Sequence, residues 1–353
     1  MRLFRENCVK KRSLTKDISM SQKILLITGG AGYIGSHAVV AFEQAGYKTV
    51  IIDNLSNSSR ESLNGIQKIL WYIPDFYECD ICDQIGLKNI FEKYSFDGVI
   101  HFAGLKAVGE SCEEVRLYHS NNVWGSITLF WVMQDFWVHK IVFSSSATVY
   151  SHENISPLRE DMSLATTNPY GTTKLIIEKL LEDYTKHANW RVVNLRYFNP
   201  IGAHPSWYIG EVPSGVPNNL LPYILDVASG KREKVRVFGD DYDTLDGTWV
   251  RDYIDVCDLV DAHIFAYRHL DDAKFGVYNI GTGIGTSVLE MIKITSDVTG
   301  KEIPYEVAGR RSGDIASVYC DPSLAQETIE FTAKTGIQES VNNGWKFILN
   351  AQS

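Results

Sequence analysis

The sequence predicts an α/β fold in which a doubly wound parallel sheet carries a smaller C-terminal α/β lobe. Short apolar, β-rich runs alternate with helical stretches through the first half of the chain, as is typical of parallel strands joined by right-handed helical crossovers. This alternation loosens after about residue 200. A length of 353 residues suits about two domains, or one large domain with an appended lobe. We therefore expect a sheet domain over 21–198 and a second lobe over 199–353, interwoven with the first.

The elements of the first half follow in order along the chain. A buried strand is predicted at Lys23–Thr28, and a glycine turn follows it at Gly29–Gly35. The next stretch, Ser36–Ala45, has a helical pattern that ends at Gly46. Further apolar strands are predicted at Thr49–Asp53, Gly98–Phe102, Lys140–Ser144 and Arg191–Leu195. Prolines and glycines then cluster over 200–222, where the second lobe is expected to begin.

Charge and hydropathy exclude some classes of partner. The chain has 34 Lys and Arg against 43 Asp and Glu, a net charge of −9. Nucleic acids and membrane surfaces are polyanionic, so neither is expected as the main partner. No apolar run approaches the roughly 18 residues of a membrane helix. Residues 1–20 carry six basic and two acidic groups but no apolar core of a secretory signal, and the acids fit a transit peptide poorly. We expect a disordered basic extension there, and a cytoplasmic protein.

The cysteine pattern predicts no metal. Cys79 and Cys82 form a C-x-x-C, but the chain has no second such pair and no nearby pair of histidines, so a zinc site would lack two ligands. A redox pair would open a helix in a thioredoxin-like context, which is absent from the pattern. We interpret the spacing as incidental, in a protein whose cysteines stay reduced in the cytosol.

A dinucleotide site is predicted at the first turn. Gly29, Gly32 and Gly35 give a G-x-x-G-x-x-G spacing between a predicted strand and a predicted helix. Such glycines let the backbone approach a pyrophosphate at a helix N-terminus, where free N–H groups favour negative charge. Asp53 ends the second predicted strand, where a carboxylate accepts hydrogen bonds from ribose hydroxyls and repels a 2′-phosphate. Asp53 alone would also suit a turn or a helix cap, but the order of elements favours a Rossmann-like site for NAD over NADP.

A second constellation predicts proton and hydride chemistry at an alcohol carbon. Tyr170 and Lys174 are spaced i, i+4 at the start of a predicted helix, which places both on one face. A free tyrosine is a poor base at neutral pH, and we expect the Lys174 ammonium together with a cationic nicotinamide to lower its pKa. The strand that starts at Lys140 ends in three serines, of which Ser146 can share a proton with the same substrate oxygen.

Longer strings join these motifs and cover the chain from about residue 23 to 330: Gly29–His37, Asp53–Leu55, His101–Ser111, Ser144–Tyr150, Asn168–Gly171, Leu195–Pro205, Pro217–Leu220 and Arg251–Ile254. On these strings the chain resembles the extended short-chain dehydrogenase/reductase family, and within it the branch of NAD-dependent UDP-glucose 4-epimerases. Several of the strings are typical of that branch rather than of the fold in general.

The resemblance implies a role for each matching residue. Ser146, Tyr170 and Lys174 would be catalytic. The cofactor would contact Gly29, Gly32, Tyr33, Ile34, Gly35, Asp53, Asn54, Asn57, Ser58, Asp80, Ile81, Phe102, Ala103, Gly104, Lys106, Asn121, Ser146, Tyr170, Lys174 and Phe198. The UDP-sugar would contact Lys106, Ser146, Tyr170, Tyr197, Asn199, Asn219, Leu220, Phe238, Arg251, Tyr253, Arg311, Asp314 and Val318. The two arginines of the second set suit a diphosphate, because a guanidinium can fork onto it.

The resemblance also implies a reversible redox cycle that inverts the sugar carbon C4. Tyr170 would take the proton of the 4-hydroxyl while C4 gives hydride to NAD; the 4-keto sugar would turn, and hydride would return to its other face. Because net redox is zero, NAD should stay tightly bound. Relatives of this branch usually dimerise, so we expect a homodimer. The resemblance also implies a role in galactose metabolism.

Some residues depart from the pattern of that branch and leave other functions open. Trp249 stands where small residues are usual, Asp255 replaces a histidine, and Trp207 enlarges a loop, so a non-catalytic homologue that binds NAD or a sugar nucleotide stays possible. A 4,6-dehydratase would need an Asp-Glu pair where Ala147-Thr148 stands, and a net dehydrogenase would release NADH. Val318, four positions after Asp314, borders the sugar 2-position in this family. A valine leaves room for an N-acetyl group, so UDP-N-acetylhexosamines remain candidate substrates.

Overall fold

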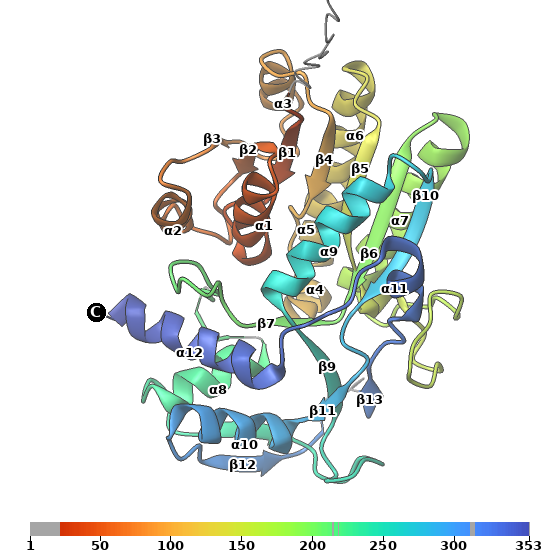
Figure 1. The fold of residues 1–353 in the computed structure, drawn as a ribbon. Coiled ribbons are helices and arrows are strands. Elements are labelled where there is room, and N and C mark those ends of the chain that lie inside the picture. The colour runs from red at the N-terminus through yellow and green to blue at the C-terminus, as the bar shows by residue number, and fades with distance from the viewer. Residues whose placement is uncertain (1–21, 214, 218, 311–314, 353) are drawn as a thin grey trace, which may run out of the picture.

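Seven parallel strands form the central sheet, in the order β10-β6-β5-β4-β1-β2-β3 (Figure 1). The computed structural model describes residues 22–213, 215–217, 219–310 and 315–352, so the expected extension at 1–20 lies outside it. The strands are β1 (Ile24–Thr28), β2 (Lys48–Asp53), β3 (Asp75–Glu78), β4 (Gly98–His101), β5 (Lys140–Ser146), β6 (Arg191–Tyr197) and β10 (Phe275–Ile280). The prediction of a doubly wound parallel sheet is confirmed, and the sequence pattern missed β3 and β10.

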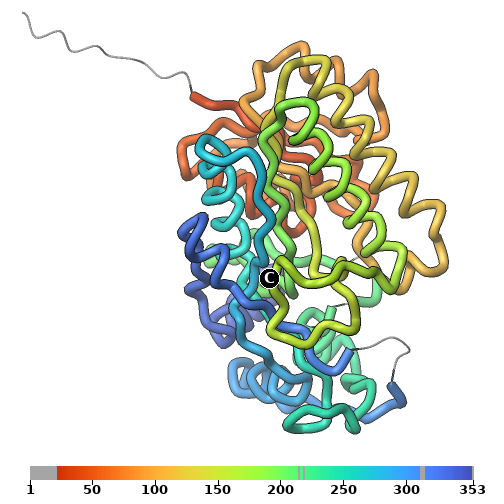
Figure 2. Tube along the Cα trace, turned by 90° about the vertical axis from the view of Figure 1, so that its right-hand side faces the viewer, coloured from red at the N-terminus to blue at the C-terminus, as the bar shows by residue number. Residues whose placement is uncertain are grey.

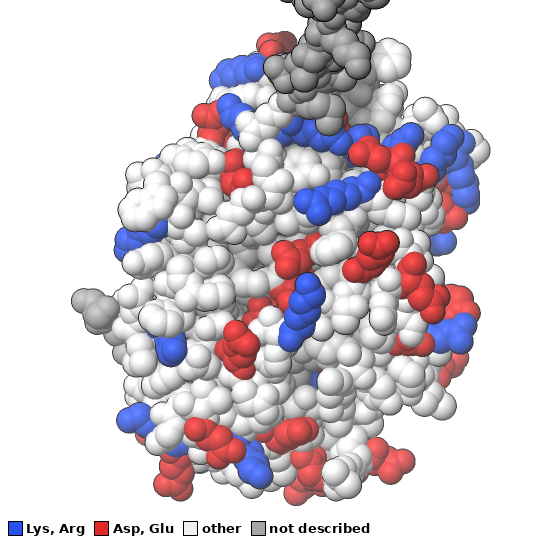
Figure 3. All heavy atoms as spheres, viewed as in Figure 1, with Lys and Arg blue, Asp and Glu red and all other residues white. Residues whose placement is uncertain are grey.

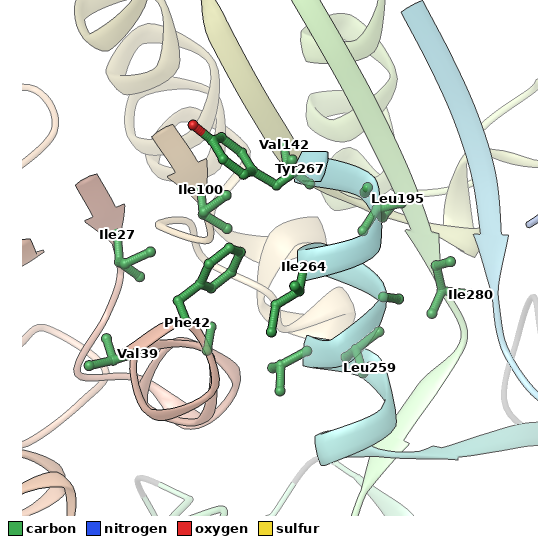
Figure 4. Close-up of a cluster of buried hydrophobic side chains, with 14 of the residues drawn as sticks. Ile27, Val39, Phe42, Ile100, Val142, Leu195, Leu259, Ile264, Tyr267 and Ile280 are labelled. Carbon is green, nitrogen blue, oxygen red and sulfur yellow. The ribbon is translucent and has the colours of Figure 1, made fainter. Parts of the chain in front are cut away.

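Helices cover both faces of this sheet, and each face buries its own apolar cluster. One face carries α1 (Tyr33–Gln44), α2 (Glu61–Leu70) and α9 (Val256–His269); the other carries α3 (Gln84–Phe91), α6 (Gly125–Asp135) and α7 (Pro169–His187). In Figure 4 the ring of Phe42 lies between α1 and α9, over strand residues such as Ile100. The five inner strands, β1, β2, β4, β5 and β6, are buried on both faces, which explains why they appear in the sequence as continuous apolar runs.

The second lobe lies at one end of the sheet and has a core of its own (Figure 2). Its strand β9 (Val250–Asp255) pairs with β7 (Asn199–Ile201), β11 (Gly285–Ser287) and β13 (Ser317–Val318). A separate parallel pair joins β8 (Val235–Phe238) to β12 (Tyr305–Ala308). The helices of this lobe are α8 (Leu220–Ala228), α10 (Val288–Thr299) and α12 (Ile337–Gln352).

The chain returns to the first sheet after it has entered the second lobe. Strand β10 pairs in parallel with β6, and α9 packs against α1. The division at residue 198 stays a prediction, because the first sheet includes β10 and is covered by α9, and both come from beyond residue 198. Short segments complete the fold: α4 (Val108–Glu113), α5 (Val115–Tyr118), the π-helical η1 (His119–Trp124), the 3₁₀ turn η2 (Ala147–Val149) and α11 (Ser323–Ile329). Among the described residues, no helix is long and apolar enough to cross a lipid bilayer.

Candidate active site

The predicted site residues follow the carboxyl ends of neighbouring strands. Because all seven strands run parallel, these ends share one edge, and ligands of open α/β sheets bind outside that edge. The chain passes directly from β6 to β7 and from β10 to β11, so the same edge faces the second lobe (Figure 1). The fold therefore brings the predicted cofactor residues of the first half toward the predicted substrate residues of the second.

The glycine turn between β1 and α1 is packed too tightly for side chains. Gly29 has a φ of +67°, and a Cβ on it would lie 2.8 Å from the nitrogen of Ala103. A Cβ on Gly35 would lie 2.1 Å from the carbonyl oxygen of Gly29. Helix α1 begins at Tyr33, earlier than predicted, and its N-cap Gly32 supplies no side-chain acceptor. The first N–H groups of α1 therefore have no side-chain cap, which suits a diphosphate.

The carboxylate of Asp53 is buried and held against this turn. Its Oδ2 accepts a hydrogen bond from the nitrogen of Ala31 at 3.0 Å, within the glycine turn. Its Oδ1 accepts from Leu55 N at 2.9 Å and from Ser58 Oγ at 2.8 Å, so a second predicted cofactor residue lies beside it. Asp53 thus makes the local hydrogen bonds of a turn residue and also lies beside the glycine turn that is predicted to bind the pyrophosphate.

Asp80 follows β3 and joins the predicted adenosine side of the site. Asn54 Nδ2 and Cys82 N donate to its two oxygens, each at 2.7 Å. Burial would raise the pKa of Asp80, but these hydrogen bonds lower it below its ordinary value. Burial raises the pKa of Cys79 to about 11 and that of Cys82 to about 12, so both stay thiols at neutral pH. Ile81 between them is buried against the sheet.

The segment after β4 is held by an asparagine that the sequence did not single out. Asn122 Oδ1 accepts from Leu105 N at 2.8 Å and from Asn121 Nδ2 at 2.9 Å, and its own Nδ2 donates to Thr173 Oγ1 at 3.1 Å. These contacts tie the loop of predicted cofactor residues to α7. Four other predicted cofactor residues lie in or beside this loop and the end of β6: Phe102, Ala103, Gly104 and Phe198.

The three predicted catalytic residues meet where β5 ends and α7 begins. Asn168 caps α7 by accepting from Gly171 N at 2.8 Å, and Pro169 occupies the first turn. This start places Tyr170 beside Ser146, with which it shares a hydrogen bond. One turn later, Lys174 Nζ donates to the carbonyl oxygen of Ser144 at 2.6 Å.

The electrostatics of the pair differ from the sequence-based expectation. Burial raises the pKa of Tyr170, and the hydrogen bond with Ser146 acts in the opposite direction. Lys174 Nζ lies 5.9 Å from the Tyr170 ring centroid, and it donates to a carbonyl rather than to the phenol. Burial also lowers the pKa of Lys174 to about 7. The expected lowering of the Tyr170 pKa also depended on a cationic nicotinamide. Taken together, the protein's own groups do not lower that pKa.

Thr148 supports Ser146 and was not singled out as a functional residue. Its nitrogen and its Oγ1 both donate to Ser146 Oγ, at 3.2 and 3.0 Å. Because Ser146 Oγ accepts two hydrogen bonds from Thr148, its own hydroxyl proton is available to another acceptor. Its hydrogen bond with Tyr170 uses that proton. The Ser-x-Thr spacing at the end of a strand is the sequence signal that would have found it.

In the second lobe, strand β9 carries two of the predicted substrate residues. Arg251 and Tyr253 are two positions apart, and β13 pairs so that Val318 lies opposite Arg251. Asn199 of β7 lies opposite Tyr253. Four predicted substrate residues therefore share one small sheet. Arg311 and Asp314 lie outside the described residues.

Two unusual residues at the ends of this strand, one just before it and one at its last position, have clear structural positions. The Trp249 ring lies under the Arg251 guanidinium, 4.7 Å from it, in a cation–π contact. Asp255 accepts from Cys257 N at 2.8 Å and so caps α9, which is a function aspartate performs well. Its Oδ2 is buried, and burial raises the pKa of the carboxyl group, whereas hydrogen bonds from Ser340 and Cys257 act to lower it.

One carboxylate links the two lobes and was missed by sequence reasoning. Glu211 Oε1 accepts from Lys106 Nζ at 3.1 Å and from Asn219 Nδ2 at 2.8 Å. Lys106 belongs to the loop after β4, and Asn219 is the N-cap of α8, whose first residue is Leu220. Two other predicted substrate residues have contacts of their own. Phe238, the last residue of β8, lies under the Arg236 guanidinium, and the Tyr197 hydroxyl forms a hydrogen bond with His263.

Comparisons with known proteins agree with this geometry. Residues 25–281 match the NAD dependent epimerase/dehydratase family. The chain is 50% identical to a UDP-glucose 4-epimerase of Bacillus subtilis over 325 residues, 92% of this chain and 96% of the relative. It is 49% identical to one from Cyamopsis tetragonoloba over 334 residues, 93% of this chain and 95% of the relative. A Stenotrophomonas maltophila UDP-glucose-4-epimerase crystallised with NAD and formylated UDP-arabinopyranose superposes with a TM-score of 0.91 at 42% identity, covering 94% of this chain and 100% of its own. The chain belongs to the NAD dependent epimerase/dehydratase family.

Proposed function

We propose that this protein interconverts UDP-glucose and UDP-galactose by inverting C4 of the sugar, with NAD tightly bound, and that it acts in galactose metabolism. The observation that carries the proposal is the meeting of Ser146, Tyr170 and Lys174 at the sheet edge that also holds the glycine turn. The named relatives at about half identity support the same activity.

The residues at the turn fit the cofactor. The cradle at Gly29 and Gly35 leaves no room for a Cβ, and α1 starts without a side-chain cap. Asp53 would hold the adenosine ribose, Asp80 and Ile81 the adenine, and Lys174 the second ribose. When bound, NAD supplies a hydride acceptor that later returns the hydride to the same carbon.

The chain's own residues would handle the proton. Tyr170 Oη takes it from the sugar 4-hydroxyl, and Ser146, which already shares a hydrogen bond with Tyr170, donates to the same sugar oxygen. Lys174 Nζ lies 5.9 Å from the Tyr170 ring and, together with the cationic nicotinamide of bound NAD, would favour the phenolate when it is charged. Because burial excludes water from this corner, these interactions act at low dielectric. In the second lobe, Arg251 would bind the diphosphate, and Asn219, Leu220 and Phe238 the uridine.

The direct test is to incubate the purified protein with UDP-galactose, without added cofactor, and to follow UDP-glucose. Tyr170→Phe should abolish epimerisation while NAD stays bound, since it removes only a hydroxyl; loss of a positioned base typically costs about 10²–10⁴-fold. Tyr184→Phe, on the same helix, is the matched control and should keep wild-type turnover. Wild-type turnover in Tyr170→Phe would refute the assignment, and accumulation of NADH at 340 nm would indicate a net dehydrogenase.

A second candidate substrate class is the UDP-N-acetylhexosamines. The observation that favours it is the register that sets Val318 opposite Arg251, so that a small side chain borders a residue proposed to hold the diphosphate. The same incubation with UDP-N-acetylglucosamine measures this activity.

We also propose a homodimer. Leu117, Trp124 and Trp131 are seven residues apart along the helical run α5-η1-α6 and are 46%, 51% and 43% exposed. The two tryptophan rings contact edge to face, with centroids 5.3 Å apart, and an apolar stripe of this kind suits a self-complementary interface. Trp131→Glu should yield monomer in analytical ultracentrifugation. Trp137→Glu, at a more exposed tryptophan outside the stripe, should not.

The remaining parts of the proposal concern partners and compartment. On the face seen in Figure 3, acidic and basic side chains are interspersed, which does not favour a nucleic-acid or membrane partner. The described cysteines are all free thiols, which supports a cytoplasmic location. Cell fractionation tests the location.

A further inference from the structure

A buried carboxylate lies one turn beyond Lys174 on the same face of α7. Glu178 follows Tyr170 and Lys174 at the same four-residue spacing, and its side chain is almost fully buried. Arg196 of β6 donates to it twice, from Nε at 3.0 Å and from Nη2 at 2.7 Å. The catalytic helix thus carries a charged group that the proton-transfer steps do not use.

Glu178 also binds the end of β5 directly. Ser145 Oγ donates to Glu178 Oε1. Ser145 lies between Ser144, whose carbonyl accepts from Lys174, and Ser146, which shares a hydrogen bond with Tyr170. One carboxylate therefore holds the residue whose two neighbours contact the proposed base and its lysine.

The carboxylate is itself fixed from the far side. Besides its two bonds to Glu178, Arg196 donates to Tyr150 Oη at 3.1 Å and to the carbonyl of Glu160 at 3.2 Å. Tyr150 Oη in turn donates to Asn279 Oδ1 at 2.7 Å on β10. A buried network that satisfies its polar groups in this way is rigid.

We propose that Glu178 is a positioning residue of the reaction: through Ser145 it fixes the end of β5 against α7 and so sets the placement of Ser146 relative to Tyr170 and Lys174. This inference rests on the proposed function of those three residues.

Glu178 has an electrostatic effect on Lys174 as well. Burial lowers the pKa of Lys174, and the negative charge of Glu178 raises it. Among the described residues, the other titratable groups facing Lys174 are Tyr170 on α7 and His101 on β4, and burial lowers the pKa of His101 to about 3, so it stays neutral. Arg196 forms an ion pair with Glu178, so its positive charge affects Lys174 only as part of that pair. Removing the carboxylate should therefore favour the neutral amine of Lys174.

The experiment compares three variants of the full chain by kcat, KM, bound NAD and pH profile. Ser145→Ala cuts the link and leaves the Glu178–Arg196 pair intact, so it should lower kcat about tenfold or more at unchanged KM and NAD content, because small misplacements at a reacting centre cost up to about 10²-fold. Glu178→Gln keeps an acceptor for Ser145 and removes the charge, so it should move the high-pH loss of activity to lower pH. Ser340→Ala, at an equally buried serine in α12, is the control and should change neither quantity.

Amide hydrogen exchange over 144–148 gives a readout that needs no turnover. Exchange there should rise in Ser145→Ala and stay at the wild-type level in Ser340→Ala. Unchanged exchange, or lower melting temperatures with wild-type kcat and pH profile, would overturn the positioning role. An inactive wild-type protein would refute the proposed function instead, and the exchange data would still decide the structural half of the inference. Should Glu178→Gln fail to fold because it leaves Arg196 unpaired, Ser145→Ala carries the test.

Discussion

Replacing Gly35 by alanine tests the cofactor cradle with a single methyl group. A Cβ at this position would lie 2.1 Å from the Gly29 carbonyl oxygen and 2.8 Å from Gly30 Cα, where ordinary contact begins at 3.4 Å. Both neighbours are backbone atoms of the turn, so no side chain can swing aside. The turn and α1 must therefore separate by about 1 Å, and overpacking of this kind costs up to about 3 kcal/mol.

Two measurements should register this displacement. At about 2–4 °C per kcal/mol for a protein of 150–250 residues, the melting temperature should fall by about 6–12 °C, or somewhat less in this longer chain. The phosphate-facing N–H groups move with the turn, so they should bind the pyrophosphate less well. A misplacement of about 1 Å at a site can also lower the reaction rate on the order of 10²-fold. NAD released on acid denaturation should drop well below one per chain, and added NAD should raise the melting temperature less than in the wild type.

Gly109→Ala is the matched control for Gly35→Ala. Gly109 lies in α4 with nothing within 4 Å of its added Cβ, so alanine should leave the melting temperature unchanged or raise it slightly. If Gly35→Ala retains wild-type NAD content and melts within about 1 °C of the wild type, the steric argument is wrong. A lower melting temperature with full NAD content would show that Gly35 serves packing alone.

Four further predictions follow from the site. Because burial lowers the pKa of Lys174 to about 7, its ammonium is lost as the pH rises through that value, and kcat/KM should fall about tenfold per unit above it; a rate that is flat from pH 6 to 9 would contradict this. The unfolded chain holds this proton up to about pH 10.4, so the unfolding free energy of the wild type relative to Lys174→Met should rise with pH between those values. Asp53→Asn should strengthen NADP binding about tenfold by removing one like-charge contact, measured by fluorescence titration against NAD. Val318→Tyr should lower the turnover ratio of UDP-N-acetylglucosamine to UDP-glucose at least about tenfold; an unchanged ratio would show that Val318 does not border the sugar.

The five inner strands of the sheet were predictable because each is buried on both faces and so forms a continuous apolar run. Strand β3 was missed for the opposite reason. It is a four-residue edge strand, Asp75–Glu78, with exposed ends and no apolar run. Strand β10 is apolar enough, but its place beside β6 depends on a crossover that returns from the second lobe, which no local pattern specifies.

The site was predictable where chemistry is tied to a strand end, as with Asp53 and Ser146. What the sequence could not specify is the direction of each polar bond. Lys174 donates to a backbone carbonyl rather than to the phenol, because its rotamer follows the packing of α7 on β5. The bond between Glu178 and Arg196 joins a helix to a strand and depends on their register. Asp255 departs from the family pattern at a position where this chain needs a helix cap.

The return of β10 and α9 to the first sheet has a consequence for synthesis on the ribosome. Until residue 280 has emerged, β6 has an unpaired edge, and the apolar face of α1 lacks the helix that covers it. A nascent chain that ends near residue 198 therefore exposes both a strand edge and an apolar surface, which are the features that favour aggregation. The cofactor half cannot finish folding ahead of the substrate half. Ribosome-bound chains stalled just before β10 should consequently recruit chaperones, and chains stalled after α11 should be released from them.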